Sequence, residues 1–98
     1  MNDSGQRQRL DKWLWHARMA RTRPAAVSLI EAGFVRVNAK RAEQAAKLVG
    51  VGDVLTLALP QRVVVLEILA IAARRGGFPE ASKLYRVIDQ PPEDEMRQ

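Results

Sequence analysis

The sequence predicts an α+β domain in which two short helices precede a small, mainly antiparallel sheet. Apolar residues recur at helical spacing over the first third of the chain, and short alternating or β-branched runs follow them. The 98 residues are enough for one domain with its own core. The chain contains no cysteine, which excludes disulfides and thiolate metal sites and fits a reducing compartment.

The first helix is predicted over residues 10–19. Its apolar stripe follows the i, i+3, i+4, i+7 spacing and consists of Leu10, Trp13, Leu14 and Ala17. The neighbouring residues off this stripe are basic or aromatic: Arg9, Lys12, Trp15, His16 and Arg18. We therefore expect Trp13 in the core and Trp15 among cations on the outer face. Residues 1–8 are expected to be a disordered polar leader.

A second helix is predicted over residues 24–32, after a very short turn. Pro24 suits the first turn of a helix, which places Thr22 or Arg23 at the N-terminal cap. The buried stripe of this helix is predicted to contain Ala26, Leu29 and Ile30. Gly33 tolerates positive φ and is expected to end it.

Three strands are predicted from alternation and β-branched residues, over 34–37, 54–59 and 62–72. Asn38-Ala39 is expected to turn the chain after the first, although alanine accepts positive φ less readily than glycine. Residues 42–46 fit either a loop or a helical turn. The short Pro60-Gln61 connection indicates an antiparallel hairpin between the last two strands.

The end of the chain is predicted to form a short helix that docks on the sheet. Apolar residues recur at helical spacing after a break at residues 74–79, namely Ala81, Leu84, Tyr85 and Ile88. Residues 90–98 contain two prolines and three consecutive acids, and we expect a disordered acidic tail. One domain over residues 9–89 is therefore predicted.

The positive charge is concentrated in the first half of the chain. The net charge is +5, and residues 1–50 carry ten Lys or Arg against four Asp or Glu, whereas residues 51–98 carry six against seven. This asymmetry favours a polyanion partner, with RNA, DNA and anionic lipid as the alternatives. A membrane is the least favoured, because the core needs the tryptophan-bearing stripe and no apolar run reaches the roughly 18 residues of a membrane span. No signal peptide is visible, and a cytoplasmic protein is expected.

The sequence does not favour an enzyme. His16 is the sole histidine, which rules out a two-histidine metal site, and no nucleophile motif accompanies it. The glycines follow neither the dinucleotide nor the P-loop spacing. We expect no catalytic residue, no metal and no cofactor, and a surface position near phosphate for His16. Asp53 and Glu67 are explained by a turn and by an edge-facing strand position.

A nucleic-acid interface has a physical basis in the first helix and the turn that follows. Its basic side chains are Arg9, Lys12 and Arg18, which would neutralise phosphates or else form a merely solvated face. Trp15 would either stack on an unpaired base or pack under the C-terminal segment. In the turn, two guanidinium groups, a hydroxyl and helix-start amides converge into a phosphate site at Arg21, Thr22 and Arg23.

These residues resemble a known family. The matching residues occur in order along the chain: Arg9-Leu10-Asp11-Lys12-Trp13-Leu14, Ala17-Arg18, Thr22-Arg23, Ala26, Gly33, Val35-Arg36-Val37-Asn38 and Val51-Gly52-Asp53. Over residues 9–59 the chain is similar to the S-four RNA-binding domain. Lys12-Trp13-Leu14-Trp15 before Ala17-Arg18, with Pro79-Glu80-Ala81 later, most resembles the stand-alone heat shock protein 15 group.

The resemblance implies an α+β domain whose helices and hairpin form one RNA-binding surface, without enzymatic activity. It implies binding to ribosomal RNA of the large subunit, with tRNA nearby, and a role in the rescue of stalled ribosomes. Carried over by position, the RNA-facing residues are Arg9, Lys12, Arg18, Thr22, Arg23, Arg36 and Asn38. The rest of the hairpin adds Lys40 and Arg41, and Asp11 is implied to be a structural partner of an arginine. We expect a monomer.

Two departures from the family pattern bear on this interpretation. Ala39 stands where the family usually has glycine, which leaves open the hairpin geometry and the direction of Lys40 and Arg41. Better-known members carry a long basic C-terminal extension, whereas this sequence ends after Glu93-Asp94-Glu95. We expect a lower affinity or a role like that of shorter quality-control relatives. The remaining alternatives are a DNA-binding module, a ribosome-assembly factor and an interaction protein that docks through residues 63–72.

Overall fold

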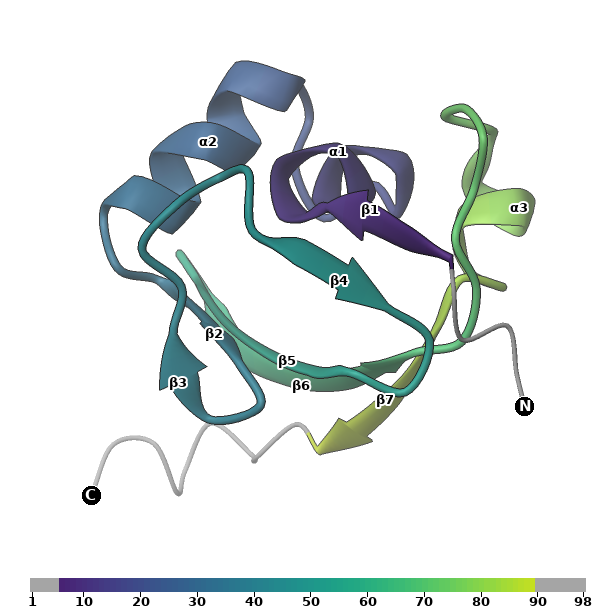
Figure 1. Ribbon diagram of the computed structural model, residues 1–98. Coiled ribbons are helices and arrows are strands. Elements are labelled where there is room, and N and C mark those ends of the chain that lie inside the picture. Colours follow the sequence, from purple (N-terminus) through teal and green to yellow (C-terminus); the bar gives the residue numbers. More distant parts are fainter. Residues whose placement is uncertain (1–5, 90–98) are drawn as a thin grey trace.

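The computed structural model describes residues 6–89, which form helices packed on antiparallel strands (Figure 1). The helices are α1 (Leu10–His16), α2 (Arg23–Glu31) and α3 (Phe78–Ala81). The strands are β1 (Arg7–Arg9), β2 (Val35–Val37), β3 (Lys40–Arg41), β4 (Leu48–Gly50), β5 (Val54–Leu59), β6 (Arg62–Ile68) and β7 (Tyr85–Asp89).

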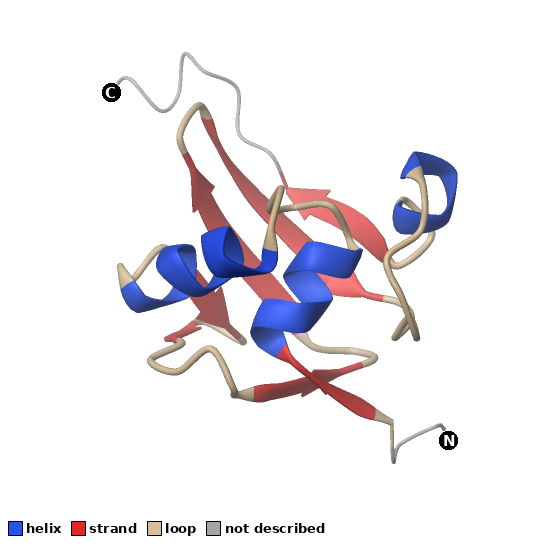
Figure 2. Cartoon of the chain, turned by 90° about the horizontal axis from the view of Figure 1, so that it is seen from above, coloured by secondary structure: helices blue, strands red, loops and turns tan. Residues whose placement is uncertain are grey.

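The strands form two sheets. The larger has the order β3-β2-β5-β6-β7 with every neighbouring pair antiparallel, and the smaller is the antiparallel pair β1-β4. Both α1 and α2 cover the same face of the larger sheet, as the view from above shows (Figure 2). The predicted α+β class is confirmed.

The core lies between the two longer helices and the larger sheet. The predicted stripe of α1 is buried throughout, with Leu10, Trp13 and Leu14 at 0% exposure. The sheet contributes further buried side chains, which are Val35, Val37, Leu55, Leu57, Val64, Leu66 and Ile68. The Trp13 ring packs edge-on against Tyr85 of β7, with 6.4 Å between ring centroids. Burial of this indole therefore joins the first helix to the last strand.

Helix α1 ends at His16, three residues earlier than predicted. Arg18 has a φ of 61°, its N–H donates to the Trp15 carbonyl at 3.1 Å, and the Met19 N–H donates to the Leu14 carbonyl at 2.9 Å. This pair of bonds is a Schellman motif, which usually has glycine at the left-handed position. Periodicity alone did not reveal the stop, because arginine occupies that position.

Helix α2 has the N-cap candidate and the glycine stop that its sequence predicts, and its bounds lie within one residue of the predicted 24–32. Thr22 is the N-cap, and its hydroxyl oxygen accepts a hydrogen bond from the Ala25 N–H at 3.1 Å. Gly33 follows the helix with a φ of 90°, while the Phe34 N–H donates to the Leu29 carbonyl at 3.0 Å. The helix itself begins at Arg23, one residue before the predicted start.

The β2–β3 hairpin forms despite the alanine in its turn. Asn38 and Ala39 have φ values of 52° and 74°, the two positive angles that a two-residue type I′ turn requires. The Asn38 side chain donates to an Asp53 carboxylate oxygen at 3.1 Å and accepts from the Val54 N–H at 2.9 Å. These bonds hold the turn against β5 and offset the strain at Ala39.

Three element predictions are wrong in extent or type. Strand β1 begins inside the expected leader and pairs with β4, and neither three-residue strand is long enough to show alternation. Strand β6 stops at Ile68 instead of residue 72. The terminal helix is only the four-residue α3, and β7 pairs with the edge of β6, so the helical spacing there was misleading. Residues 1–5 and 90–98 lie outside the described residues.

Candidate nucleic-acid interface

A buried carboxylate organises the start of α1. Asp11 is 1% exposed. Its Oδ1 accepts from Arg9 Nε at 3.1 Å and from the Lys12 N–H at 2.8 Å, and its Oδ2 accepts from Arg9 Nη2 at 3.1 Å and from Arg23 Nε at 3.4 Å. The carboxylate thus holds two guanidinium groups side by side, although their residues are fourteen positions apart. We call Arg9, Asp11 and Arg23 the Asp11 cluster.

The charge state of Asp11 depends on its partners. Burial alone would raise the pKa of this carboxyl, but the Arg9 hydrogen bond, the Lys12 amide and the charges of Arg23 and Arg9 outweigh it. The net result is a pKa below the usual value. Asp11 is therefore ionised at neutral pH, as the predicted role of a structural partner requires. The Arg9 and Arg23 side chains remain 48% and 39% exposed, so both face solvent as well as the carboxylate.

A shallow pocket extends the Asp11 cluster onto the outer side of α2. Its lining residues are Arg9, Asp11, Arg23, Pro24, Val27 and Ser28. The turn that leads into it contains exposed Arg21 and Thr22. The hydroxyl oxygen of Thr22 already accepts the Ala25 N–H as the helix cap. Thr22 is therefore the N-cap, one of the two candidates that the sequence left open, and Arg23 is partly exposed. Phosphate binding by Arg21, Thr22 and Arg23 stays a prediction.

The hairpin carries a second set of cations. Arg36 and Arg41 are cross-strand partners, and like charges directly opposite each other destabilise a hairpin unless an anion lies near them. Arg36 stands between two buried valines on β2, so alternation directs it away from the helices, whereas Lys40 points to the helix side. The Arg41 guanidinium lies against Gly33, where an added Cβ would approach its Cζ to 2.9 Å.

Of the two aromatic residues at the end of α1, His16 differs from its prediction, whereas Trp15 lies beside a cation of the C-terminal part of the chain, one of the alternatives that the sequence left open. His16 is 1% exposed, so the predicted surface position is wrong: residues 72–75 cover it, and its Nδ1 lies 3.1 Å from the Ala72 carbonyl. Burial lowers the pKa of His16, the Ala72 bond raises it, and the charges of Lys12, Arg23 and Arg75 lower it further. Trp15 is half-buried under Arg75, whose Cζ lies 5.8 Å from the ring centroid.

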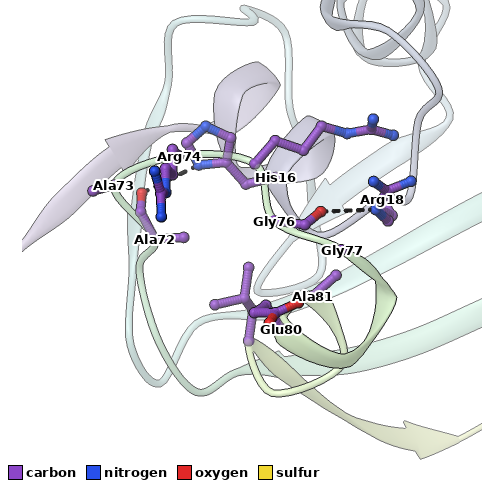
Figure 3. Close-up of a pocket in the computed structure, with 11 residues that line it drawn as sticks. His16, Arg18, Ala72, Ala73, Arg74, Gly76, Gly77, Glu80 and Ala81 are labelled. Carbon is purple, nitrogen blue, oxygen red and sulfur yellow. Dashed lines mark hydrogen bonds between the residues drawn. The ribbon is translucent and has the colours of Figure 1, made fainter.

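Arg18 lies at the opposite end of α1 from Arg9. Its Nε donates to the Gly76 carbonyl at 3.0 Å (Figure 3). This contact joins Arg18 to the segment 74–77, where Arg74 and Arg75 add cations that sequence reasoning treated only as a break. The consecutive arginines beside two glycines were the available signal.

The structure thus brings together some of the predicted residues. Arg9 and Arg23 meet at Asp11, Arg36 and Arg41 are cross-strand partners in the hairpin, and Arg18 meets the segment 74–77. Lys12 is half-buried on α1 and lies near His16. Their union into one continuous surface stays a prediction.

Within residues 6–89, no three His, Asp or Glu side chains gather in a way that could hold a metal ion. No helix in this range is long and apolar enough to cross a membrane. The site to be explained is therefore the basic one.

Comparison with known proteins identifies the family. The S4 (S-four) domain profile matches residues 8–55, the range that contains the Asp11 cluster and the hairpin. The fold matches the solved trimeric structure of heat shock protein 15 from Vibrio cholerae with a TM-score of 0.78 and 36% identity, covering 94% of this chain and 89% of that one. The chain belongs to the heat shock protein 15 family. The resemblance stated from the motifs is confirmed.

Other members of the heat shock protein 15 family are similar in sequence. The homologue from Haemophilus influenzae is 44% identical over 78 residues, covering 80% of this chain and 59% of that protein. Heat shock protein 15 from Escherichia coli K12 is 40% identical over 79 residues, covering 79% of this chain and 57% of that protein. The chain therefore spans less than two thirds of the length of these two relatives.

Proposed function

We propose that this heat shock protein 15 family member binds structured RNA without catalysing a reaction. The observation that carries the proposal is the Asp11 cluster, in which one buried carboxylate positions two half-exposed guanidinium groups side by side. Two guanidiniums against one carboxylate leave a net positive charge at the surface, and their fork geometry suits a phosphate. The match of this region to the S4 domain supports the same proposal.

The proposed target is ribosomal RNA of the large subunit, in the cytoplasm. The resemblance to heat shock protein 15 supports a ribosome-associated role, and we propose rescue of stalled large subunits that still carry tRNA. A stress-response role belongs to the same proposal. The RNA contacts would be made by α1, the turn before α2 and the β2–β3 hairpin.

The test is salt-dependent binding to a large-subunit RNA fragment. If about six phosphates are contacted, affinity falls roughly 10³-fold between 50 and 200 mM salt. Arg23→Gln should weaken binding about tenfold, because it removes one of the paired guanidiniums. It should leave the melting temperature nearly unchanged, because Arg9 and the Lys12 N–H still donate hydrogen bonds to the Asp11 carboxylate. The matched control is Arg62→Gln, which removes one exposed charge at the β5–β6 turn.

Two further measurements separate the alternatives. Co-sedimentation with isolated large subunits, whole ribosomes or neither tests the rescue and assembly roles. Competition between ribosomal RNA and duplex DNA at fixed salt tests a DNA-binding module. Binding to RNA that hardly changed with salt would contradict the proposal and favour an interaction protein.

A further inference from the structure

The pocket at the C-terminal end of α1 joins positive charge from the S4 match to positive charge from residues 74 and 75 beyond it. It has a volume of about 720 Å³ and lies between the end of α1, the segment 72–77 and α3, with Leu84 beside them (Figure 3). Its charged lining residues are Arg18, Arg74, Arg75 and Glu80, together with His16. The salt bridges found within residues 6–89 involve Asp11 and Glu67 and leave Glu80 unpaired with these arginines. Three guanidiniums against one carboxylate create a positive potential in the cavity.

Two of the arginines are held in place by reciprocal hydrogen bonds. Arg18, at the end of α1, donates through Nε to the Gly76 carbonyl at 3.0 Å. Arg75, from the opposite segment, donates through Nε to the Trp15 carbonyl at 3.0 Å. Each guanidinium also lies over an aromatic ring, Arg18 at 5.9 Å from the centroid of Phe78 and Arg75 at 5.8 Å from that of Trp15.

This arrangement positions the guanidiniums before any ligand arrives. Both backbone bonds use Nε, so they leave the terminal amino groups of Arg18 and Arg75 for an outside acceptor. Aromatic contacts restrict the remaining rotation, which lowers the entropic cost of binding. Arg74 is exposed at the same cavity and has no hydrogen bond or salt bridge of its own within residues 6–89.

The wall opposite α1 also requires close backbone packing. A Cβ on Gly76 would approach the Glu80 Cβ to 2.9 Å, and one on Gly77 would approach Glu80 Oε1 to 3.2 Å. The two glycines therefore let the segment lie directly against Glu80. This packing keeps the Arg18 acceptor, the Gly76 carbonyl, at the cavity.

We infer that this pocket binds a backbone phosphate of RNA through Arg18, Arg74 and Arg75, as a second contact that extends beyond residues 8–55 through Arg74 and Arg75. The inference rests on the proposed RNA-binding function. A phosphodiester offers the acceptor oxygens that two preset guanidiniums and a third, flexible one require. RNA is the source of that phosphate because α1 also begins at the Asp11 cluster, so one strand lying along this helix reaches both sites.

The first experiment measures the salt dependence of RNA binding for Arg74→Gln and Arg75→Gln. Each lost phosphate contact reduces the slope of log K against log salt by about one. We expect this reduction and about a tenfold loss of affinity at 100 mM salt for each variant. Arg62→Gln, with the same charge change, should retain the wild-type slope. Equal slopes for all three variants would overturn the inference.

The second experiment uses His16 as a reporter, because it is the sole histidine and lines the pocket. The surrounding cations Lys12, Arg23 and Arg75 lower the pKa of His16. A phosphate bound beside it should raise this pKa, because a nearby anion favours the imidazolium form. Saturating RNA should therefore shift the ring resonances of His16 in NMR spectra of the wild type. In the Arg74→Gln and Arg75→Gln double variant, the shift should be lost.

The controls separate this inference from the proposed function. If wild-type protein binds no RNA, both fail. If Arg23→Gln weakens RNA binding while the pocket variants match Arg62→Gln, only the pocket inference fails. If inorganic phosphate at millimolar concentration shifts His16 but RNA does not, the site takes a free anion and the RNA assignment is wrong. An Arg75→Gln variant that lowers the melting temperature without changing RNA binding would mean that Arg75 has a structural role only. Arg74→Gln tests phosphate binding at the pocket independently of that role.

Discussion

At the scale of single residues, Asp11 combines a structural and a functional role. Its carboxylate is inaccessible to solvent, yet its hydrogen-bond partners include two arginines that are not. A buried carboxylate is costly unless it is paired and hydrogen-bonded, and here the pairing also positions the cations for a ligand. The same residue therefore links the stability of the α1–α2 corner to the geometry of the proposed phosphate site.

We predict that Asp11→Asn destabilises the fold by about 1–2 kcal/mol at neutral pH, because it weakens charge-assisted hydrogen bonds to partly exposed partners. The pKa of Asp11 is lower in the folded protein than its ordinary value of 3.8. Its contribution is therefore complete above that value and is lost as the pH falls through the lower folded-state pKa. Urea unfolding of both proteins should show the difference shrinking below about pH 4. A difference that stays constant from neutral to acidic pH would contradict this assignment.

Trp13 is the residue on which the core most depends. We predict that Trp13→Ala destabilises the protein by about 3–5 kcal/mol through the cavity it leaves. The variant also leaves the Ala70 carbonyl without the indole N–H that donates to it at 3.0 Å. Trp13→Phe is the matched variant, which keeps most of the volume and loses the hydrogen bond, so it should cost less. A Trp13→Ala protein that melts normally but no longer binds RNA would mean that the facing of α1 is wrong.

At the scale of elements, two connections place non-glycine residues in the left-handed region. Arg18 ends α1 at a φ of 61°, and Ala39 turns the hairpin at a φ of 74°. Such residues cost roughly 1–2 kcal/mol each relative to glycine. At Arg18 the side chain bonds to Gly76 and lines the pocket, so the strain accompanies a contact that glycine could not make.

The Ala39 side chain makes no comparable contact, so replacing it with glycine should increase the stability of the fold. Ala39→Gly should stabilise the protein by about 1 kcal/mol, because glycine adopts positive φ without the clash of a Cβ. The melting temperature should rise by about 4–8 °C, as measured by circular dichroism. Ala58→Gly, at an exposed strand position with no positive φ, should lower it instead. A lower melting temperature for Ala39→Gly would exclude strain at this turn.

The elements also show where sequence reasoning succeeded and where it stopped. The stripe of α1, the cap at Thr22 and the stop at Gly33 were predictable because each depends on local spacing or chemistry. Pairing between strands that are distant in the sequence was not predictable, because β1 and β4 are each stabilised by the other and β7 is stabilised by the edge of β6. The apolar spacing of the last segment suits either a helix or a strand until its neighbour is known.

The features of the candidate site were likewise only partly predictable from the sequence. The grouping of basic residues near α1 was predictable from charge, and the role of Asp11 as the partner of an arginine was implied by the family resemblance. The burial of His16 and the position of Arg75 over Trp15 depend on a segment more than fifty residues away. No local pattern records that contact, so the pocket at the end of α1 could be found only in the structure.

At the scale of the whole molecule, side chains of the N-terminal segment donate hydrogen bonds to backbone carbonyls just beyond the end of β6. Beyond Ile68 the carbonyl of Ala70 accepts from the Trp13 indole, and that of Ala72 accepts from Gln8 Nε2 at 2.9 Å. These side-chain bonds, together with those from the Leu69 and Ala70 N–H groups to the Leu84 carbonyl, hold the chain beyond Ile68 in place of a regular strand ladder. We therefore expect the S4-matching region and the C-terminal third to unfold as one cooperative unit.

This mutual dependence predicts the behaviour of a fragment containing residues 1–59. The fragment retains the whole S4 match, but it lacks buried Val64, Leu66 and Ile68 of β6 and leaves the Trp13 indole N–H without its acceptor. Burying an aliphatic side chain contributes about 1.5–3 kcal/mol, so three losses approach the whole stability of a small domain. We expect poorly dispersed NMR spectra and no cooperative melting, whereas residues 1–89 should fold. A fragment that folded and bound RNA would show that the family match is a self-sufficient unit and that β6 and β7 only extend it.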